Sequence, residues 1–600
     1  MKASQLFLVV GLAWVASGCR NVPAMEVEDP ITNNCDGEWC SVETLSSITR
    51  DLDLIFVIDT SLSMADEQVL LQRNFPALIR VLGEISGGLP NLHLGVITPD
   101  LGTAPYDIPG CDRPGGDGGR FLKGLNDSCS NPLNQKYVVD VEPRGCNIQK
   151  TIAAGQPTIC DSHDCTQANC DVAAFTDLEG NATEPAGLVL AVDENGCPRC
   201  RNYTGENLEA VFSCIAGLGV NGCGMEQPLE AMVKAVTDGS GANAGFLRHD
   251  AYLAIFFLSD EDDCSAKDGV LFNPEGDLNS TLGPLTSFRC TEFGVFCDQP
   301  WQRVMPNGRL TYTHCRPREA NDPRNMLHPI SRYTNTLGQL ADASRILVGA
   351  ITGPYRNAET LIEDSLTVGV DLEGNPALQP SCGLPTQGAM PAVRLEAFVE
   401  SMLQWEEDRP WAFTSICAAD YSGALAGLGT RVRSLLETQC LTTPLCGCPD
   451  PSFAGGGEKL TALPDAEAAV CAPTCAVEDL DGDGNVTEIP PCAMDYLGGH
   501  PPKRDPALPV AACHHVTFNA QCAIPCPGYS TYQGCDPATN PFYGPSRGAE
   551  LVISRRADPA PGTHQTIRCA GTPLTEWHLC FNGVDDDVDG LVDADDPDCR

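Results

Sequence analysis

An apolar run that ends in an acidic, hydroxyl-rich turn constrains the fold of this chain more than any other feature. Apolar side chains fill residues 52–58 apart from Asp53, and the turn Asp59-Thr60-Ser61-Leu62-Ser63 follows directly. A nearly continuous apolar run of this length is typical of a central parallel strand that is covered on both faces. The chain therefore needs an α/β core large enough to enclose that strand.

Other segments continue an alternation of strands and helices. Apolar runs at residues 92–97, 252–258 and 346–351 predict three more buried strands. Apolar residues at helical spacing predict helices over residues 71–82, 229–236 and 425–435, and Pro76 is expected to kink or end the first of them. We therefore expect a doubly wound, mostly parallel sheet flanked by helices, which is a Rossmann-like arrangement.

The cysteines predict disulfides and an oxidising compartment. The 600 residues include 32 Cys, 47 Pro and 58 Gly, and so many thiols are hard to keep reduced in a cytosol. Residues 104–205 and 264–325 are rich in Cys, Pro, Gly and Asp, so we expect disulfide-stapled insertions there. The pair Cys197/Cys200 has no matching second half of a zinc site, and disulfides are expected there and at Cys513.

The charge balance disfavours two classes of partner. The sequence contains 80 acidic and 37 basic residues, which gives a net charge of −43. A surface with this excess of negative charge repels phosphate backbones and anionic lipid. We expect no nucleic-acid partner. Cations and cationic partners suit this surface, although acidity alone also serves simple solvation.

The amino terminus predicts export. Lys2 precedes an apolar run at residues 6–15, and small residues 16–18 lead into Cys19. This pattern resembles a bacterial lipobox, which implies a signal peptide at residues 1–19, acyl chains on Cys19 and a membrane anchor of lipid alone. The alternative is an ordinary cleaved signal peptide with Cys19 in a disulfide. Residues 20–50 are polar and aperiodic, as expected for a tether.

The turn after the first strand predicts a cation site. One carboxylate and two hydroxyls at Asp-x-Ser-x-Ser spacing can face a single hard cation at the carboxyl end of a strand. The segment from Phe56 to Met64 resembles the metal-ion-dependent adhesion site of von Willebrand factor type A (VWA) domains, and Phe256-Phe257-Leu258-Ser259-Asp260 resembles their later acidic strand end. The resemblance covers residues 51–440. It implies Mg²⁺ or Ca²⁺ held by Asp59, Ser61, Ser63 and Asp260, with a carboxylate of a protein partner completing the shell.

The chain departs from the family pattern in a middle loop. The family usually has a threonine before a helix, whereas residues 221–228 contain none. Glu226 is the candidate oxygen ligand in its place, or a disulfide at Cys223 has displaced that ligand. The alternative is a metal-free site in which Ser61 and Ser63 cap a helix. Glu261, Asp262 and Asp263 add acidity but are equally well explained as solvated loop residues.

Two further acidic segments suggest calcium. Oxygen side chains alternate at Asp479, Asp481, Asp483 and Asn485, as in the first half of an EF-hand or thrombospondin type 3 loop, although Pro490 stands where an EF-hand has its bidentate Glu. The tail at residues 576–600 resembles short Asp-rich modules bounded by cysteines. Its candidate ligands between Cys580 and Cys599 are Asp585, Asp587, Asp589 and Asp593.

The sequence contains little that suggests catalysis. It has no His-Glu-x-x-His, Gly-x-Ser-x-Gly or phosphate-binding Gly-Lys-Ser/Thr motif, and no small-molecule substrate is identified. We expect a lipid-anchored binding or adhesion protein of the bacterial cell envelope, at the outer membrane or cell surface, and not an enzyme. The alternative is a structural envelope protein with calcium-stabilised loops. The Cys- and Pro-rich residues 441–575 have no assigned fold, and an enzyme hosted in that region is the third alternative.

Overall fold

The structure is a computed structural model, and it describes the central part of the chain almost continuously. That part is residues 50–437, except 86, 112, 152–156, 172–174, 177–181, 184–186, 239–240, 249–250, 342–344, 356–364, 384–387 and 404–411. Short stretches are also described, at residues 35–36, 39–40, 475–480, 486–492, 508–518, 524–525, 542–543, 549–556 and 564–569.

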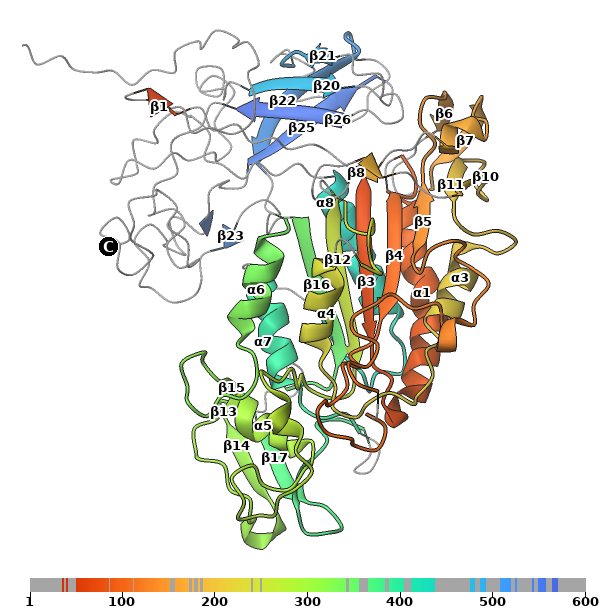
Figure 1. Ribbon diagram of the computed structural model, residues 1–600. Coiled ribbons are helices and arrows are strands. Elements are labelled where there is room, and N and C mark those ends of the chain that lie inside the picture. The colour runs from red at the N-terminus through yellow and green to blue at the C-terminus, as the bar shows by residue number, and fades with distance from the viewer. Residues whose placement is uncertain are drawn as a thin grey trace, which may run out of the picture.

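A mixed sheet of eight strands forms the centre of the molecule (Figure 1). The strands are β3 (Asp51–Ile58), β4 (Asn91–Ile97), β5 (Val138–Val141), β10 (Val189–Val192), β11 (Pro198–Arg201), β12 (Tyr252–Ser259), β16 (Ile346–Thr352) and β19 (Phe413–Ser415). Their spatial order is β10-β11-β5-β4-β3-β12-β16-β19. The pairs from β4 to β19 are parallel, whereas β5, β11 and β10 add an antiparallel edge.

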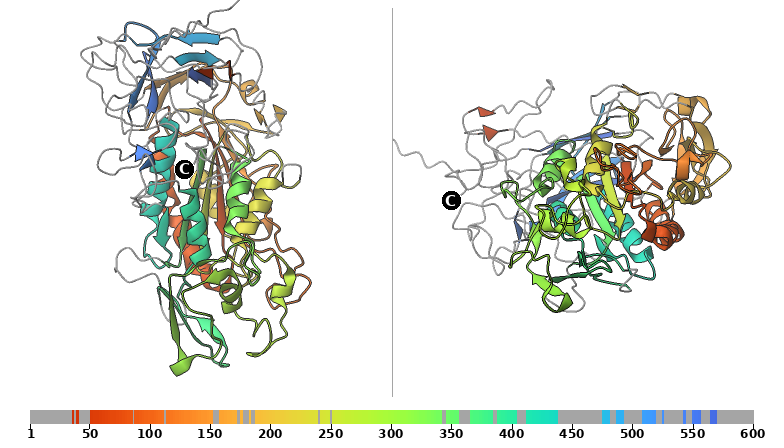
Figure 2. Two further views of the ribbon diagram at one scale, coloured as in Figure 1. Left: turned by 90° about the vertical axis from the view of Figure 1, so that its left-hand side faces the viewer. Right: turned by 60° about the horizontal axis from the view of Figure 1, so that its bottom comes forward.

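Helices cover both faces of this sheet, as Figure 2 shows. One face packs against α1 (Ala65–Gly83), α3 (Leu208–Ile215) and α8 (Ser422–Glu437), and the other against α4 (Pro228–Thr237), α6 (Ile330–Gly338) and α7 (Val393–Met402). Strand β3 supplies both cores, because its side chains alternate between the faces. Leu54 and Phe56 belong to the first core, and Ile55 and Val57 to the second.

The α/β fold expected from the sequence is confirmed. The four predicted buried strands correspond to β3, β4, β12 and β16, and the three predicted helices to α1, α4 and α8. Helix α1 continues through Pro76 instead of ending there. Because β3 pairs with β4 on one side and β12 on the other, the strand order changes direction at β3, which is where open α/β sheets place ligand sites.

The first expected insertion is partly built into the main sheet, since β5, β11 and β10 lie within residues 104–205. All eight cysteines between Cys111 and Cys200 form disulfides, so Cys197 and Cys200 are not zinc ligands. The bonds are Cys111–Cys223, Cys129–Cys214, Cys146–Cys165, Cys160–Cys197 and Cys170–Cys200. The same region contains α2 (Ala168–Asp171), β6 (Ile148–Thr151), β7 (Ile159–His163), β8 (Phe175–Thr176) and β9 (Ala182–Thr183).

The second expected insertion builds a small lobe together with a later hairpin. It contributes α5 (Phe288–Gly294), β13 (Val295–Phe296), β14 (Leu310–Thr313) and β15 (Arg316–Pro317). The hairpin consists of β17 (Ser365–Val370), which pairs with β14, and β18 (Pro376–Leu378), which pairs with β17. The disulfides Cys264–Cys290 and Cys297–Cys315 staple it, and Cys382–Cys417 lies nearby in the chain. This lobe has its own apolar core around Phe288, Tyr312 and Val368.

The described stretches beyond residue 440 are antiparallel strands. Their bounds are β20 (Cys475–Leu480), β21 (Val486–Ile489), β22 (Ala512–Phe518), β23 (Ile524–Pro525), β24 (Phe542–Tyr543), β25 (Ala549–Arg555) and β26 (His564–Cys569). Cys513 is bonded to Cys492, so the disulfide expected at Cys513 is confirmed. No helix in the described part of the chain is both long and apolar enough to span a bilayer.

Candidate metal site

The turn after β3 holds its carboxylate and hydroxyls in a fixed arrangement. Asp59 is fully buried, and its Oδ1 accepts the backbone N–H of Ser61 at 2.7 Å. The hydroxyl oxygens of Ser61 and Ser63 lie 3.2 Å apart. Gln68, one turn into α1, donates to the Asp59 carbonyl at 2.9 Å and so pins the turn to the helix. The Asp-x-Ser-x-Ser spacing thus places three oxygen-bearing side chains on one side of the turn.

The end of β12 brings the second carboxylate to this turn. Strand β12 pairs in parallel with β3, and the Asp59 N–H donates to the Leu258 carbonyl at 2.9 Å. Asp260 therefore lies beside the turn. Burial raises the pKa of Asp260, and hydrogen bonds from Ser63 and Ser61 offset only part of that shift. Its Oδ1 is buried without a hydrogen-bond partner among the described residues. The four residues expected to form the site are brought together.

The middle loop supplies Glu226 and also contains a disulfide. Cys223 is bonded to Cys111, and Glu226 is only 1% exposed with its Oε1 unpaired within the described residues. The loop packs directly onto the turn. Gly222 donates to the Thr60 carbonyl at 2.8 Å, and a Cβ at Gly222 would lie 2.1 Å from the Thr60 hydroxyl oxygen, so only glycine fits.

Burial raises the pKa of the carboxyl groups at this site, and the charges of their neighbours raise it further. Burial and the Asp260 charge raise the pKa of Asp59 to about 7. Burial together with Asp260 and Asp59 raises the pKa of Glu261 to about 8, and burial with Glu261 and Asp59 raises that of Glu226. The largest charge interactions on these groups all come from other carboxylates. A cation placed among them would relieve both the repulsion and the burial cost.

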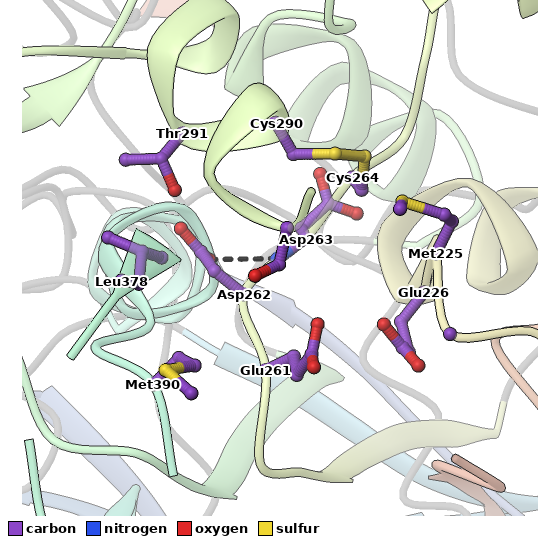
Figure 3. A pocket seen from close by; sticks show the side chains of 12 residues that line it. Met225, Glu226, Glu261, Asp262, Asp263, Cys264, Cys290, Thr291, Leu378 and Met390 are labelled. Atoms are coloured by element: carbon purple, nitrogen blue, oxygen red, sulfur yellow. Dashed lines mark hydrogen bonds between the residues drawn. A yellow bond between two sulfur atoms is a disulfide. The ribbon is translucent and has the colours of Figure 1, made fainter. Parts of the chain in front are cut away.

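Glu261, Asp262 and Asp263 differ in role, and they are not simple solvated loop residues. Asp263 is buried and binds the guanidinium of Arg394, with Nη2–Oδ2 at 3.0 Å. Asp262 accepts the backbone N–H groups of Arg394 and Leu395 at 3.0 Å, at the start of α7. Only Glu261 points toward Glu226, as Figure 3 shows. Two of the three acids therefore anchor α7.

Sequence reasoning did not identify three further oxygen side chains near the site. Ser259 donates to Oδ2 of Asp59 at 2.7 Å. The hydroxyl of Thr352, in register with Ser259 on β16, and one carboxyl oxygen of Glu67 are buried without a partner in the described chain. The signal for Ser259 and Thr352 was their position as the last residues of adjacent strands.

The donor set of the site is chemically suited to a hard cation. Carboxylate and hydroxyl oxygens are the ligands that Mg²⁺ and Ca²⁺ take in proteins, and the unpaired oxygens of Asp260, Glu226 and Thr352 need a partner. Within the described residues, the one tight group of three His, Cys, Asp or Glu side chains is Cys146, Asp164 and Cys165. Its two cysteines are bonded to each other, so it is not a metal centre.

Most of the other expected sites lie outside the described residues. This applies to Cys19, to Asp481, Asp483 and Asn485, and to the tail ligands Asp585, Asp587, Asp589 and Asp593. Asp479 is described, and its two carboxylate oxygens accept hydrogen bonds of 2.6 Å from Arg555. A calcium ion at the 479–485 segment would compete with that ion pair for Asp479.

No protein-family model matches this chain, and no curated protein matches it either. Arguments about function therefore depend on the geometry and chemistry of the site.

Proposed function

We propose that the chain is an exported binding protein whose VWA-like domain holds a divalent cation at Asp59, Ser61, Ser63 and Asp260. The cation is Mg²⁺ or Ca²⁺, and its open position takes a carboxylate from a protein partner. Binding of the partner, not catalysis, is the role of this site. The chain is attached to the bacterial cell envelope through lipid on Cys19, and its Asp-rich segments bind calcium.

The convergence of Asp59 and Asp260 on two serine hydroxyls carries this proposal. These residues come from the ends of two adjacent parallel strands about 200 residues apart in the chain. Buried carboxylates without a nearby cation are costly, since each charge must leave water. A divalent ion bound between these carboxylates would offset the cost of burying their charges.

The exposure of the turn supports a role in binding a partner. Ser63 is exposed, and Leu62 beside it is 81% exposed. An ion held by Ser63 would therefore face solvent on one side, where a carboxylate from another protein can reach it. Leu62 would supply an apolar contact at the rim of that interface.

A metal-free structural role is the second candidate. The Cys111–Cys223 disulfide stiffens the middle loop where the family usually has its threonine, and protonated carboxyl groups can share hydrogen bonds without any ion. In that case Asp59 and Asp260 are retained as parts of the fold, and the envelope role rests on the disulfide-stapled body.

Thermal melts of the full chain decide between the two. Because an ion that binds only the native state stabilises it by mass action, Mg²⁺ at one hundred times its Kd should add about 2.7 kcal/mol. Asp59→Ala and Asp260→Ala should fold but lose this shift. A wild-type melting temperature that is the same in Mg²⁺, Ca²⁺ and chelator would refute the metal-binding function and favour the structural one.

A further inference from the structure

Helix α1 carries an acidic residue one turn beyond the serines of the candidate metal site. The turn that contains Ser63 leads directly into α1, and Glu67 follows Ser63 by four residues. Residues at this spacing lie above one another on one side of a helix. Because helical side chains lean toward the amino terminus, the long side chain of Glu67 extends back toward the turn that follows β3.

The carboxyl group of Glu67 is only partly used by the protein. Glu67 is half-buried, and its Oε2 is buried without a hydrogen-bond partner among the described residues. Oδ1 of Asp260 is in the same condition. Burial raises the pKa of Glu67, and the Asp260 charge raises it further, so the two carboxyl groups lie near each other. Neighbouring carboxylates with buried, unpaired oxygens indicate a position for a cation between them.

Tyr421 lies beside both carboxyl groups and gives them no hydrogen bond. Its side chain is fully buried directly before α8, and its hydroxyl donates to the Ile416 carbonyl at 2.7 Å. Burial raises the pKa of Tyr421, and the charges of Glu67 and Asp260 add to the shift. The three side chains are therefore close together, and the one hydroxyl proton among them is already used.

The number and kind of ligands decide which ion suits the site. Asp59, Ser61, Ser63 and Asp260 offer two carboxylates and two hydroxyls. Mg²⁺ prefers about six oxygens, usually with no more than one or two protein carboxylates, whereas Ca²⁺ takes about six to eight in a flexible shell and accepts further carboxylates. A third carboxylate, from Glu67, would therefore favour Ca²⁺.

We propose that Glu67 is a further ligand of the ion held by Asp59 and Asp260, and that it makes this site selective for Ca²⁺ over Mg²⁺. Helix α1 then supplies an oxygen in place of the threonine that the family usually has in the middle loop. The inference rests on the proposed metal site, because Glu67 alone cannot hold an ion. It deepens that proposal by naming the ion and an additional ligand.

Calorimetric titrations of the full, disulfide-bonded chain with Ca²⁺ and with Mg²⁺ test this role. The binding that disappears in Asp59→Ala defines the site and separates it from calcium bound elsewhere in the chain. At this site the wild-type chain should bind Ca²⁺ more tightly than Mg²⁺. Glu67→Gln should weaken Ca²⁺ binding there by about tenfold or more, since the loss of even an outer group costs about 10–100-fold. Mg²⁺ binding should change much less.

Asp66→Asn is the matched control. It removes the same charge from the neighbouring residue, but Asp66 is exposed. Because exposed charges act weakly through water and salt, both affinities should stay within about twofold of the wild type. Equal losses of Ca²⁺ affinity in Asp66→Asn and Glu67→Gln would mean that the net charge at the start of α1 sets the affinity, and would overturn the role of Glu67 as a ligand.

Thermal melts separate coordination from a purely structural role of Glu67. In chelator, Glu67→Gln should melt no lower than the wild-type chain, because it removes a half-buried charge that no cation balances. In Ca²⁺ the same variant should melt lower than the wild type, because it binds the stabilising ion less tightly. A lower melting temperature in both conditions would show that Glu67 serves the fold and not the ion.

The two proposals fail in different ways. If Asp59→Ala changes the binding of neither ion, the metal site itself is refuted. If Asp59→Ala abolishes binding but the site prefers Mg²⁺, or Glu67→Gln keeps the wild-type affinity for Ca²⁺, the metal site stands and the role of Glu67 is overturned.

Discussion

The hydroxyl of Ser259 donates a 2.7 Å hydrogen bond to Oδ2 of Asp59. This bond joins the last residue of β12 to the first residue after β3, and the Ser61 N–H occupies Oδ1 of the same carboxylate. Both oxygens of Asp59 are therefore oriented before any ion arrives. Outer groups that orient a ligand in this way typically contribute a factor of 10–100 to metal affinity.

Ser259→Ala should weaken Mg²⁺ binding about tenfold without unfolding the domain. The loss arises because Asp59 would be free to rotate away from Asp260. Isothermal titration calorimetry of the full chain measures the change. Ser265→Ala is the matched control, since Ser265 makes the same kind of bond to Asp263 at 2.5 Å, and its Mg²⁺ affinity should equal that of the wild type. Equal losses in both variants would show that the Asp59 contact has no special role.

Stability without metal should fall as the pH rises from about 4 to 8. The pKa of Asp59 is raised to about 7 and that of Glu261 to about 8, whereas unfolded carboxyl groups titrate near pH 4. A raised pKa in the folded state means that the native chain holds protons which the unfolded chain has released. The contribution is therefore complete below about pH 4 and lost by about pH 8.

Divalent ions should reverse this trend, because they replace the protons on these carboxyl groups. Melting temperatures measured from pH 4 to 8 in chelator and in Mg²⁺ should diverge as the pH rises. Asp59→Asn should flatten the profile in chelator. Parallel profiles with and without Mg²⁺ would contradict a shared site for protons and metal.

Arg394→Met should lower the free energy of unfolding by about 3–5 kcal/mol, because it leaves the buried Asp263 carboxylate without its cation. Arg394 is fully buried and Asp263 is 1% exposed. Urea unfolding measures the loss. The control is Arg332→Met, whose partner Glu230 lies at 2.9 Å at the surface, and it should cost about 0–1 kcal/mol. Comparable losses would mean that burial of the Arg394 pair adds nothing.

Attachment to the membrane should depend on Cys19. The small residues before it imply acylation, and Cys19→Ala should move the exported chain from the membrane fraction to the soluble one. Fractionation with mass spectrometry of the amino-terminal peptide checks this. A variant that stays in the membrane fraction, together with an unacylated wild-type peptide, would exclude the lipid anchor.

The sequence predicted the strands whose apolar runs are long, and it missed the short ones. Strand β3 was recognisable because both of its faces are buried, so residues 52–58 are almost all apolar. The four-residue strands β5 and β11 carry polar or charged side chains such as Asp140 and Arg199. Arg199 and Asp140 form a buried ion pair with Nε–Oδ1 at 2.6 Å. The two residues are 59 positions apart in the chain, so no local sequence pattern predicts their pairing.

The candidate site was predicted from its local motif, but its surroundings were not. Asp59, Ser61 and Ser63 lie in one turn, and Asp260 follows a recognisable strand. The roles of Asp262 and Asp263 depend on Arg394, which lies more than 130 residues later in the chain. Long-range pairing of this kind decides whether an acidic residue is solvated, structural or free to bind an ion.

The disulfides of the first insertion enclose and overlap one another. The loop closed by Cys111 and Cys223 contains the one closed by Cys129 and Cys214, and three interlaced bonds lie inside both. An enzyme that only oxidises thiols in the order of synthesis would pair cysteines that are neighbours in the sequence. The resulting non-native disulfides would then have to be rearranged. The yield of correctly bonded protein should thus be limited by disulfide reshuffling, and it should be higher in a host with a strong disulfide isomerase.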